Sequence, residues 1–238
     1  MGNTYFQFKQ FRIDQDKCGM KVCQDSCILG AYTVVSSPKK ILDIGTGTGL
    51  LSLMLAQRYK NSFIDAVEIN KDAFFQAEGN FANSPWSDKI GLFKSSIQDF
   101  ALDKKEQYDL IVSNPPFFQN HLRSNDASKN VAIHNDSLSF GDLAMSVHKL
   151  LSVGGSLFVM YPEDQSFMFE KEMVSRNLYP QNRLIIKDKA TKPILRIITN
   201  YSRINTVDTK TENLIIKQPD GTYTKEFADL LKDYYLIF

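Results

Sequence analysis

The stretch that decides the fold is Ile41-Leu42-Asp43-Ile44-Gly45-Thr46-Gly47-Thr48-Gly49. Its apolar beginning predicts a buried strand, and the glycines that follow predict a tight turn that opens a helix. Gly45, Gly47 and Gly49 permit positive φ angles and let a ligand approach the backbone, because no Cβ stands in the way. Such a turn places a ligand beside the free N–H groups of a helix N-terminus. The stretch therefore predicts an α/β protein with a ligand site at this turn.

The glycine spacing disfavours a dehydrogenase. A nicotinamide or flavin fingerprint needs G-x-G-x-x-G, and its third glycine would fall at Leu50. The glycine here comes one residue earlier, at Gly49. A turn that binds no ligand is the other alternative. Asp43 argues against it, because an acidic side chain at the tip of a buried strand usually has a group to hold.

A second strand is predicted over 63–68, and it ends in the carboxylate of Glu68. A doubly wound sheet places an acid about 20 residues beyond the glycines, against a ribose diol. A carboxylate accepts two hydroxyl donors at once, which suits the ribose of any adenosine-containing cofactor. The alternative is an exposed acid at a strand end. Glu68 and its neighbour Ile69 are therefore candidate cofactor-binding residues.

The motif Ser113-Asn114-Pro115-Pro116-Phe117 follows a predicted strand at 108–112. The side-chain oxygen of Asn114 and the carbonyl of Pro115 are two acceptors for the hydrogens of an amine on a planar, unsaturated system. Such an amine is a poor nucleophile, and two acceptors favour a pyramidal nitrogen whose lone pair is directed at an electrophile. The prolines stiffen the loop, and Phe117 offers a face for stacking a flipped base. A tight loop without chemistry is the alternative.

In this order and separation, the two motifs resemble those of S-adenosylmethionine (SAM)-dependent methyltransferases that modify amino groups. The chain as a whole resembles the bacterial tRNA (adenine-N6)-methyltransferase family, which modifies adenine 37 of a valine tRNA. The N-terminus resembles the family signatures F-x-F-K-x-F, M-K-V and D-x-x-L-L-G-A-W, and the tail also fits. The corresponding segments are 6–11, 20–22, 25–32, 223–227 and 234–236.

This resemblance implies a doubly wound, Rossmann-like, seven-stranded methyltransferase sheet whose last strand is antiparallel. It implies SAM as the cofactor and the anticodon loop of a valine tRNA as the partner. Lys21 and Asp25 would lie near the methionine end of SAM, and Asn114 to Phe117 would form the target-amine site. The whole chain, 1–238, would be a single SAM-dependent methyltransferase domain, with an N-terminal extension at 1–36 and a catalytic core at 37–238.

The chain departs from the family pattern at three positions. Tyr32 replaces a tryptophan, and Ile133 stands where an arginine commonly precedes the residue equivalent to His134. Related enzymes often place an aspartate near the SAM adenine, and the corresponding position here is Ser96, followed by Ile97. A serine hydroxyl can still accept the hydrogen bond of the adenine amine.

The remaining elements alternate, which argues for a parallel sheet with helices on both faces. The segment 4–13 is predicted to form a short strand or hairpin, and 94–106 is too short and polar to assign to a helix. Two runs at 183–186 and 194–201 lack a long helix between them and are predicted to be antiparallel strands. The other predicted strands are 40–44, 89–93 and 155–161, and the predicted helices are 25–35, 48–59, 71–83, 139–151 and 164–176.

Composition suits one globular domain, with 238 residues, 43% hydrophobic and 23% charged. No apolar run reaches the roughly 18 residues that a membrane span needs, and no signal peptide is visible. Cys18, Cys23 and Cys27 lie close together, but the three histidines are distant in sequence, so free cytosolic thiols are favoured over a metal site. We expect a cytoplasmic protein without membrane or metal.

A net charge of +1 gives no global signature of nucleic-acid binding. Locally, the stretch from Arg183 to Arg203 holds six basic residues and a single acid, Asp188. The alternative is an ordinary solvated surface. The polar stretch 118–135 is predicted to be a loop that orders when substrate binds. The six basic residues are Arg183, Lys187, Lys189, Lys192, Arg196 and Arg203, and Lys9, Arg12, Lys39, Lys40, His121, Arg123 and Lys129 could extend the patch.

Two further readings of the sequence stay open. One is a methyltransferase with another amino acceptor, either guanine-N2 of ribosomal RNA or a protein glutamine amide. The presence of Phe117 rather than tyrosine argues slightly against the amide. The other is a non-catalytic SAM- or RNA-binding module, against which the intact motif from Asn114 to Phe117 argues.

Overall fold

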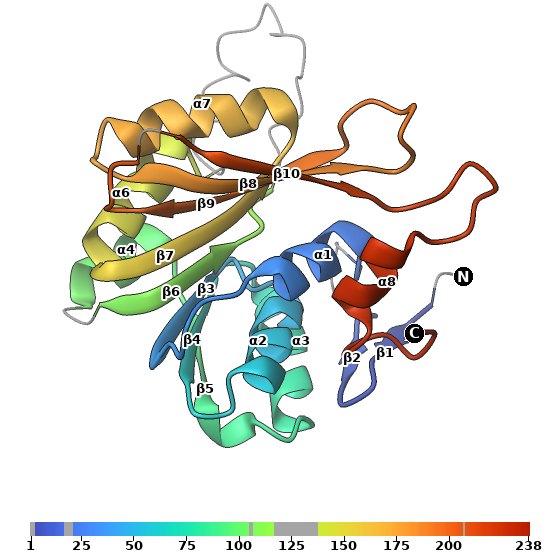
Figure 1. Ribbon diagram of the computed structural model, residues 1–238. Helices are drawn as coiled ribbons and strands as arrows, with labels where there is room; N and C mark the ends of the chain where they lie inside the picture. Colours follow the sequence, from blue (N-terminus) through green and yellow to red (C-terminus); the bar gives the residue numbers. More distant parts are fainter. Residues whose placement is uncertain (1–2, 17–20, 105–106, 117–137, 207) are drawn as a thin grey trace, which may run out of the picture.

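The computed structural model describes residues 3–16, 21–104, 107–116, 138–206 and 208–238. Its centre is an eight-stranded sheet in the order β10-β8-β9-β7-β6-β3-β4-β5 (Figure 1). The strands are β3 (Lys40–Ile44), β4 (Phe63–Glu68), β5 (Ile90–Lys94), β6 (Tyr108–Ser113), β7 (Leu151–Tyr161), β8 (Tyr179–Lys187), β9 (Arg196–Ser202) and β10 (Lys210–Ile215).

Strand β9 is antiparallel to both of its neighbours, β7 and β8, whereas every other pair in the sheet is parallel. This confirms the predicted doubly wound sheet, in which the seventh strand is antiparallel. The structure adds an eighth strand, β10, which pairs in parallel with β8 at the edge. Its sequence, Lys-Thr-Glu-Asn-Leu-Ile, begins with polar residues and gives only a weak strand signal.

Helices cover both faces of the sheet and bury two hydrophobic clusters. One face carries α1 (Gln24–Tyr32), α2 (Leu50–Arg58), α3 (Lys71–Ala82) and α8 (Lys225–Leu231). The other carries α4 (Ile97–Asp103), α6 (Phe140–Leu150) and α7 (Glu163–Val174). A 3₁₀ turn, η1 (Ser87–Lys89), precedes β5. Within the described ranges, no helix is long and apolar enough to cross a membrane.

Helix α4 forms within the segment 94–106, which is too short and polar to be assigned to a helix from its sequence. The Ser96 hydroxyl accepts from the backbone N–H of Asp99, and this capping interaction starts the helix. Ile97, Phe100 and Ala101 then bury one side of it in the sheet-facing cluster. A good cap and three buried side chains are sufficient for a helix of this length when tertiary packing supports it.

The N-terminal residues form the predicted hairpin, with β1 (Tyr5–Gln7) antiparallel to β2 (Arg12–Asp14). The hairpin is fixed to α3, because the backbone of Asp14 exchanges two hydrogen bonds of 2.9 Å with the Asn80 side chain. It is also fixed to the tail, because the Lys9 N–H donates to the Tyr234 carbonyl at 2.9 Å. The hairpin therefore packs beside α3 and the C-terminal segment (Figure 1).

Candidate functional site

The glycine turn connects β3 to α2 at the carboxyl edge of the sheet. Gly45, Gly47 and Gly49 all have positive φ angles, of 71°, 59° and 86°. A Cβ on Gly49 would lie 2.3 Å from Cε1 of Phe81, so this glycine is required by packing. A Cβ on Gly45 or Gly47 would meet nothing within 4 Å. The turn is therefore closely packed against Phe81 at Gly49 and open at Gly45 and Gly47, where a ligand could approach the backbone.

Asp43 lies beneath this turn and is fully buried. Its Oδ2 accepts from the Thr46 hydroxyl at 2.6 Å and from the Ser52 hydroxyl and N–H at 2.7 and 3.1 Å. Burial raises the pKa of this carboxyl to about 6, although the same hydrogen bonds oppose the shift. Oδ1 is buried without a hydrogen-bond partner. Asp43 thus ties the turn to the first turn of α2, and a direct contact with cofactor stays a prediction.

Glu68 ends β4 beside the glycine turn and is 7% exposed. Its Oε2 accepts from the Gly47 N–H at 2.8 Å, and Oε1 accepts from the Asn70 N–H at 2.7 Å. A carboxylate has about four acceptor positions, so two remain for hydroxyl donors. The neighbouring Ile69 is exposed. The structure therefore places Glu68 where its carboxylate both supports the turn and can receive a diol.

Ser96 lies close to this acid, because the N–H of the preceding Ser95 donates to the Glu68 carbonyl at 3.2 Å. The Ser96 hydroxyl donates to Asp99 Oδ2 at 2.7 Å and accepts from the Asp99 N–H at 3.0 Å. Ile97 is buried in the core. The Ser96 hydroxyl therefore caps α4. The predicted contact between this hydroxyl and an adenine ring has to compete with the capping hydrogen bonds.

Asn114 follows β6, next to the glycine turn, since β6 pairs with β3. Its Nδ2 donates to the Ser26 hydroxyl at 2.9 Å, and its Oδ1 is buried without a hydrogen-bond partner. Ser26, from the first turn of α1, also lies 3.0 Å from the Cys23 sulfur. Pro115 is buried and Pro116 exposed, while Phe117 lies outside the described residues. The amide is thus fixed by one end and leaves an acceptor at the other.

Sequence reasoning missed Ser26, because its contact joins residues 88 positions apart and a single serine carries no motif. The adjacent Asp25 pairs with Arg196 of β9, with 3.3 Å between Oδ2 and Nε. Burial raises the pKa of the Asp25 carboxyl, and Arg196 opposes this rise. Lys21 is exposed and donates to the Asn3 carbonyl at 3.3 Å. Asp25 therefore lies beside the Asn114 contact, whereas Lys21 contacts the N-terminal segment.

The arginines of the predicted basic patch are used inside the fold. Arg183 pairs with Glu170, Arg196 pairs with Asp25, and Arg203 donates to the His148 carbonyl at 2.5 Å. Among the extensions, Lys9 donates to the Lys232 and Phe238 carbonyls and Arg12 pairs with Asp14. Lys40 begins β3 and Lys39 precedes it, so both lie at the opposite, amino edge of the sheet.

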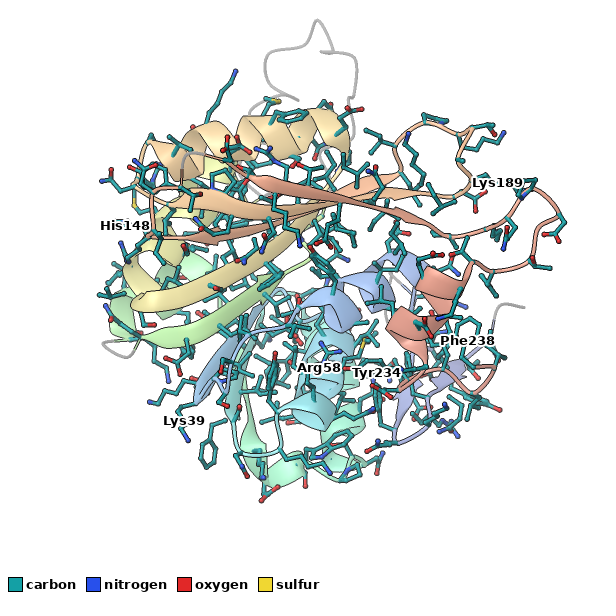
Figure 2. All side chains as sticks on the ribbon, viewed as in Figure 1. Lys39, Arg58, His148, Lys189, Tyr234 and Phe238 are labelled. Atoms are coloured by element: carbon teal, nitrogen blue, oxygen red, sulfur yellow. The ribbon has the colours of Figure 1, made fainter. Side chains whose placement is uncertain are left out.

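What remains of the patch is the group Lys187, Lys189 and Lys192. Figure 2 shows Lys39 and Lys189 on opposite sides of the molecule. His121, Arg123, Lys129, Ile133 and His134, together with the stretch 118–135, lie outside the described residues, as does Cys18. Cys23 and Cys27 form no disulfide in the described part of the chain. In the described part of the chain, no cluster of three His, Cys, Asp or Glu side chains could hold a metal ion.

The carboxyl ends of β3, β4 and β6 thus bring together an open glycine turn, an acid for a diol and an unpaired amide acceptor. The chemistry of these residues fits a nucleoside cofactor, because Glu68 has acceptor positions for a diol and Asn114 has an acceptor for an amine. Such an arrangement could align a group donor with an amine, which would be catalysis by proximity and orientation.

A sequence model of the family described as "Methyltransferase small domain" matches residues 26–164. The chain is similar to proteins named tRNA1(Val) (adenine(37)-N6)-methyltransferase from Cytophaga hutchinsonii, at 43% identity over 239 residues, and from Trichodesmium erythraeum, at 44% over 238. Each match covers 99% of both chains. Among solved structures, a predicted O-methyltransferase from Agrobacterium tumefaciens superposes with a TM-score of 0.62 at 16% identity, covering 87% of this chain and 95% of that one. This last likeness bears on the fold alone.

Proposed function

The chain belongs to the tRNA1(Val) (adenine(37)-N6)-methyltransferase family, and from this premise we propose that it transfers a methyl group from SAM to N6 of adenine 37 in a valine tRNA. The observation that carries the proposal is the Asn114 amide. Its oxygen is buried, has no partner and lies beside the glycine turn. An acceptor without a donor inside a protein costs free energy unless a ligand supplies the donor.

SAM would supply an activated methyl group on a sulfonium, and its sulfur would leave as a neutral thioether when the S–CH₃ bond breaks and the N–CH₃ bond forms. Glu68 would hold the ribose hydroxyls, and the open faces of Gly45 and Gly47 would admit the cofactor to the turn. The Asn114 Oδ1 and the Pro115 carbonyl would accept the two N6 hydrogens of adenine and so orient its lone pair for methyl transfer. No strong base is needed, because the amine loses its proton readily once it is alkylated.

The choice of valine tRNA and of position 37 rests on the names of full-length relatives. Action in the cytoplasm follows as part of the same proposal, since tRNA is the substrate. We also propose that 1–238 works as one domain. Its support is a single hydrophobic cluster that contains Phe8 of the hairpin, Leu53 of α2 and Tyr235 of the tail.

The test is Asn114→Ala in single-turnover methyl transfer to unmodified valine tRNA, read by mass spectrometry of the nucleosides. Loss of one positioned acceptor is expected to slow N6-methyladenosine formation by about 10²–10³, with SAM affinity nearly unchanged. The exposed Asn205→Ala is the matched control and should leave the rate at the parent value.

Other products would redirect the proposal. N2-methylguanosine from ribosomal RNA, or a methylated glutamine, would identify a different acceptor for the same site. If Asn114→Ala methylates tRNA as fast as the parent protein, Asn114 is not the amine-binding residue.

A further inference from the structure

Two loops at one end of the sheet are joined into a single unit, which we call the lysine fork. It consists of residues 187–192, after β8, and 215–223, after β10. The β8–β10 pairing continues past both strands, because Ile216 N–H donates to the Lys187 carbonyl at 2.9 Å and Lys217 N–H to the Asp188 carbonyl at 2.8 Å. Both loops project beyond the sheet on the side of α1 and α8 (Figure 1).

Side chains also join the two loops. Lys217 pairs with Asp188 at 3.2 Å, and the Lys189 ammonium donates to the Pro219 carbonyl at 3.1 Å. The second loop is itself a hairpin, in which the Gln218 N–H donates to the Thr222 carbonyl at 2.8 Å. A cleft of about 430 Å³ lies between the loops, lined in part by Lys189, Thr191, Asn213 and Lys217.

The charge of the fork is arranged asymmetrically. In the part of the chain that the structure describes, the ammonium groups of Lys187 and Lys192 make no hydrogen bond or ion pair. That of Lys189 keeps two of its three N–H donors after it donates one to the Pro219 carbonyl. Lys217 of the second loop is neutralised by Asp188 of the first loop. Hydrogen bonds from Thr222 and, to a smaller extent, the nearby Lys189 ammonium lower the pKa of the exposed Asp220 carboxyl at the hairpin tip. The tip therefore carries a negative charge that repels phosphate and opposes part of the Lys189 charge.

The fork lies at the same edge of the sheet as the Asn114 acceptor. Strand β6 is parallel to β7, and β9 is antiparallel to both β7 and β8. Strands β6 and β8 therefore run in the same direction. Lys187 ends β8 and Asn114 follows β6, so both leave the sheet at its carboxyl edge. Three strand spacings, or about 14 Å, separate β6 from β8, and the register places Lys187 three residues, or about 10 Å, further along the strand direction than Asn114, so about 17 Å separates them. A stretch of a few nucleotides spans this distance.

We propose that the lysine fork binds backbone phosphates of the RNA on one side of the target adenine, through Lys187, Lys189 and Lys192. The inference rests on the proposed function for the identity of the RNA, and it assigns a docking surface that the function alone does not. The Asp188–Lys217 pair and the β8–β10 extension hold the three lysines in place. The RNA runs along the first loop and avoids Asp220 at the tip of the second.

The experiment compares tRNA binding at several salt concentrations for two triple variants. The fork variant is Lys187→Gln, Lys189→Gln and Lys192→Gln. The control is Lys39→Gln, Lys60→Gln and Lys149→Gln, which removes the same charge from exposed lysines that precede β3, β4 and β7 at the opposite edge. Each lost phosphate contact reduces the slope of log K against log salt by about 0.7–0.9.

We expect the fork variant to lose two to three such contacts, while the control keeps the parent slope. SAM affinity and kcat at saturating tRNA should stay at parent values in both. Asp220→Asn is expected to tighten tRNA binding, a change opposite in sign that unfolding cannot mimic. Equal slopes for the fork and control variants would overturn the proposal.

The two proposals fail separately. If the protein methylates valine tRNA but the fork variant keeps the parent slope, the function stands and the docking surface is wrong. If the fork variant loses slope but the parent protein forms no N6-methyladenosine, the fork binds RNA and the proposed reaction is wrong.

Discussion

At the residue scale, the Asn114 amide is orientated by a neighbour that no motif contains. An amide offers a donor end and an acceptor end, and the wrong end would repel the amine hydrogens. The Ser26 hydroxyl takes the Nδ2 donor at 2.9 Å and is itself only 7% exposed. Ser26 therefore acts as a positioning residue that keeps the oxygen available.

Ser26→Ala is expected to reduce kcat about five- to tenfold, since a net hydrogen bond is worth roughly 1 kcal/mol. The Kd for SAM and the melting temperature should change little. Ser146→Ala, which removes a hydroxyl that is 5% exposed in α6, is the matched control. If Ser26→Ala lowers the free energy of unfolding by as much as it raises the activation free energy, Ser26 is only structural.

Glu68→Ala is expected to weaken SAM binding tenfold to a hundredfold, because hydrogen bonds to a charged group contribute about 1.5–3 kcal/mol. The change also removes the acceptors of the Gly47 and Asn70 N–H groups. Calorimetry with SAM measures the effect, and Glu78→Ala, an exposed acid of α3, serves as the control. Unchanged affinity in a folded Glu68→Ala protein would remove this residue from the cofactor site.

Asp43 gives the free energy of unfolding a pH dependence of defined sign. Because burial raises its pKa from 3.8 to about 6, the folded state holds this proton at pH values where the unfolded chain has lost it. The contribution is fully present below about pH 4 and is lost as pH rises to 6. The parent protein should therefore lose on the order of 3 kcal/mol relative to Asp43→Asn across this window. Urea titrations at each pH measure the free energy of unfolding of both proteins. If the difference between the parent protein and Asp43→Asn is the same at every pH, the pKa assigned to Asp43 is wrong.

At the element scale, the glycines of the turn meet two different requirements, a positive φ angle and space for a neighbouring side chain, which the sequence motif does not distinguish. All three glycines need positive φ, but only Gly49 also faces a neighbour, the Phe81 ring of α3. The motif predicted the turn and its conformational freedom. It could not predict the contact, because α3 follows a further strand and its register depends on tertiary packing.

Gly49→Ala should destabilise the protein by about 2–5 kcal/mol, from a strained φ and the clash at 2.3 Å together. Gly79→Ala lies in the helix that carries Phe81 and meets nothing within 4 Å. It should stabilise the protein by about 0.5–1 kcal/mol. Urea unfolding compares the two, and partial recovery in Gly49→Ala with Phe81→Leu would identify the ring as the obstacle.

At the scale of the whole molecule, the sequence predicted what periodicity and local motifs encode. The buried strands β3 and β4 have the predicted bounds, because their apolar runs are bordered by turn residues. Strand β10 was missed because its pairing with β8 is non-local. The expected basic patch was too large, because sequence shows charges but not their partners on other elements.

The tail illustrates the same limit. The buried Tyr234 hydroxyl donates to the Met54 carbonyl at 3.2 Å, and the Gln57 amide donates to the Asp233 carbonyl at 2.8 Å. These contacts join α2 to the last residues of the chain. Figure 2 shows Tyr234 beside Arg58 of α2. No local pattern encodes them, although they help to close one face of the sheet.

The Cys27 thiol is buried under this tail and hydrogen-bonded to Tyr235, so its chemical reactivity reports how often the tail detaches. Burial raises the pKa of the thiol to about 12, so alkylation is negligible while the tail is docked. In a Cys18→Ser, Cys23→Ser background, the rate of labelling would count how often the last residues detach, without any attached dye.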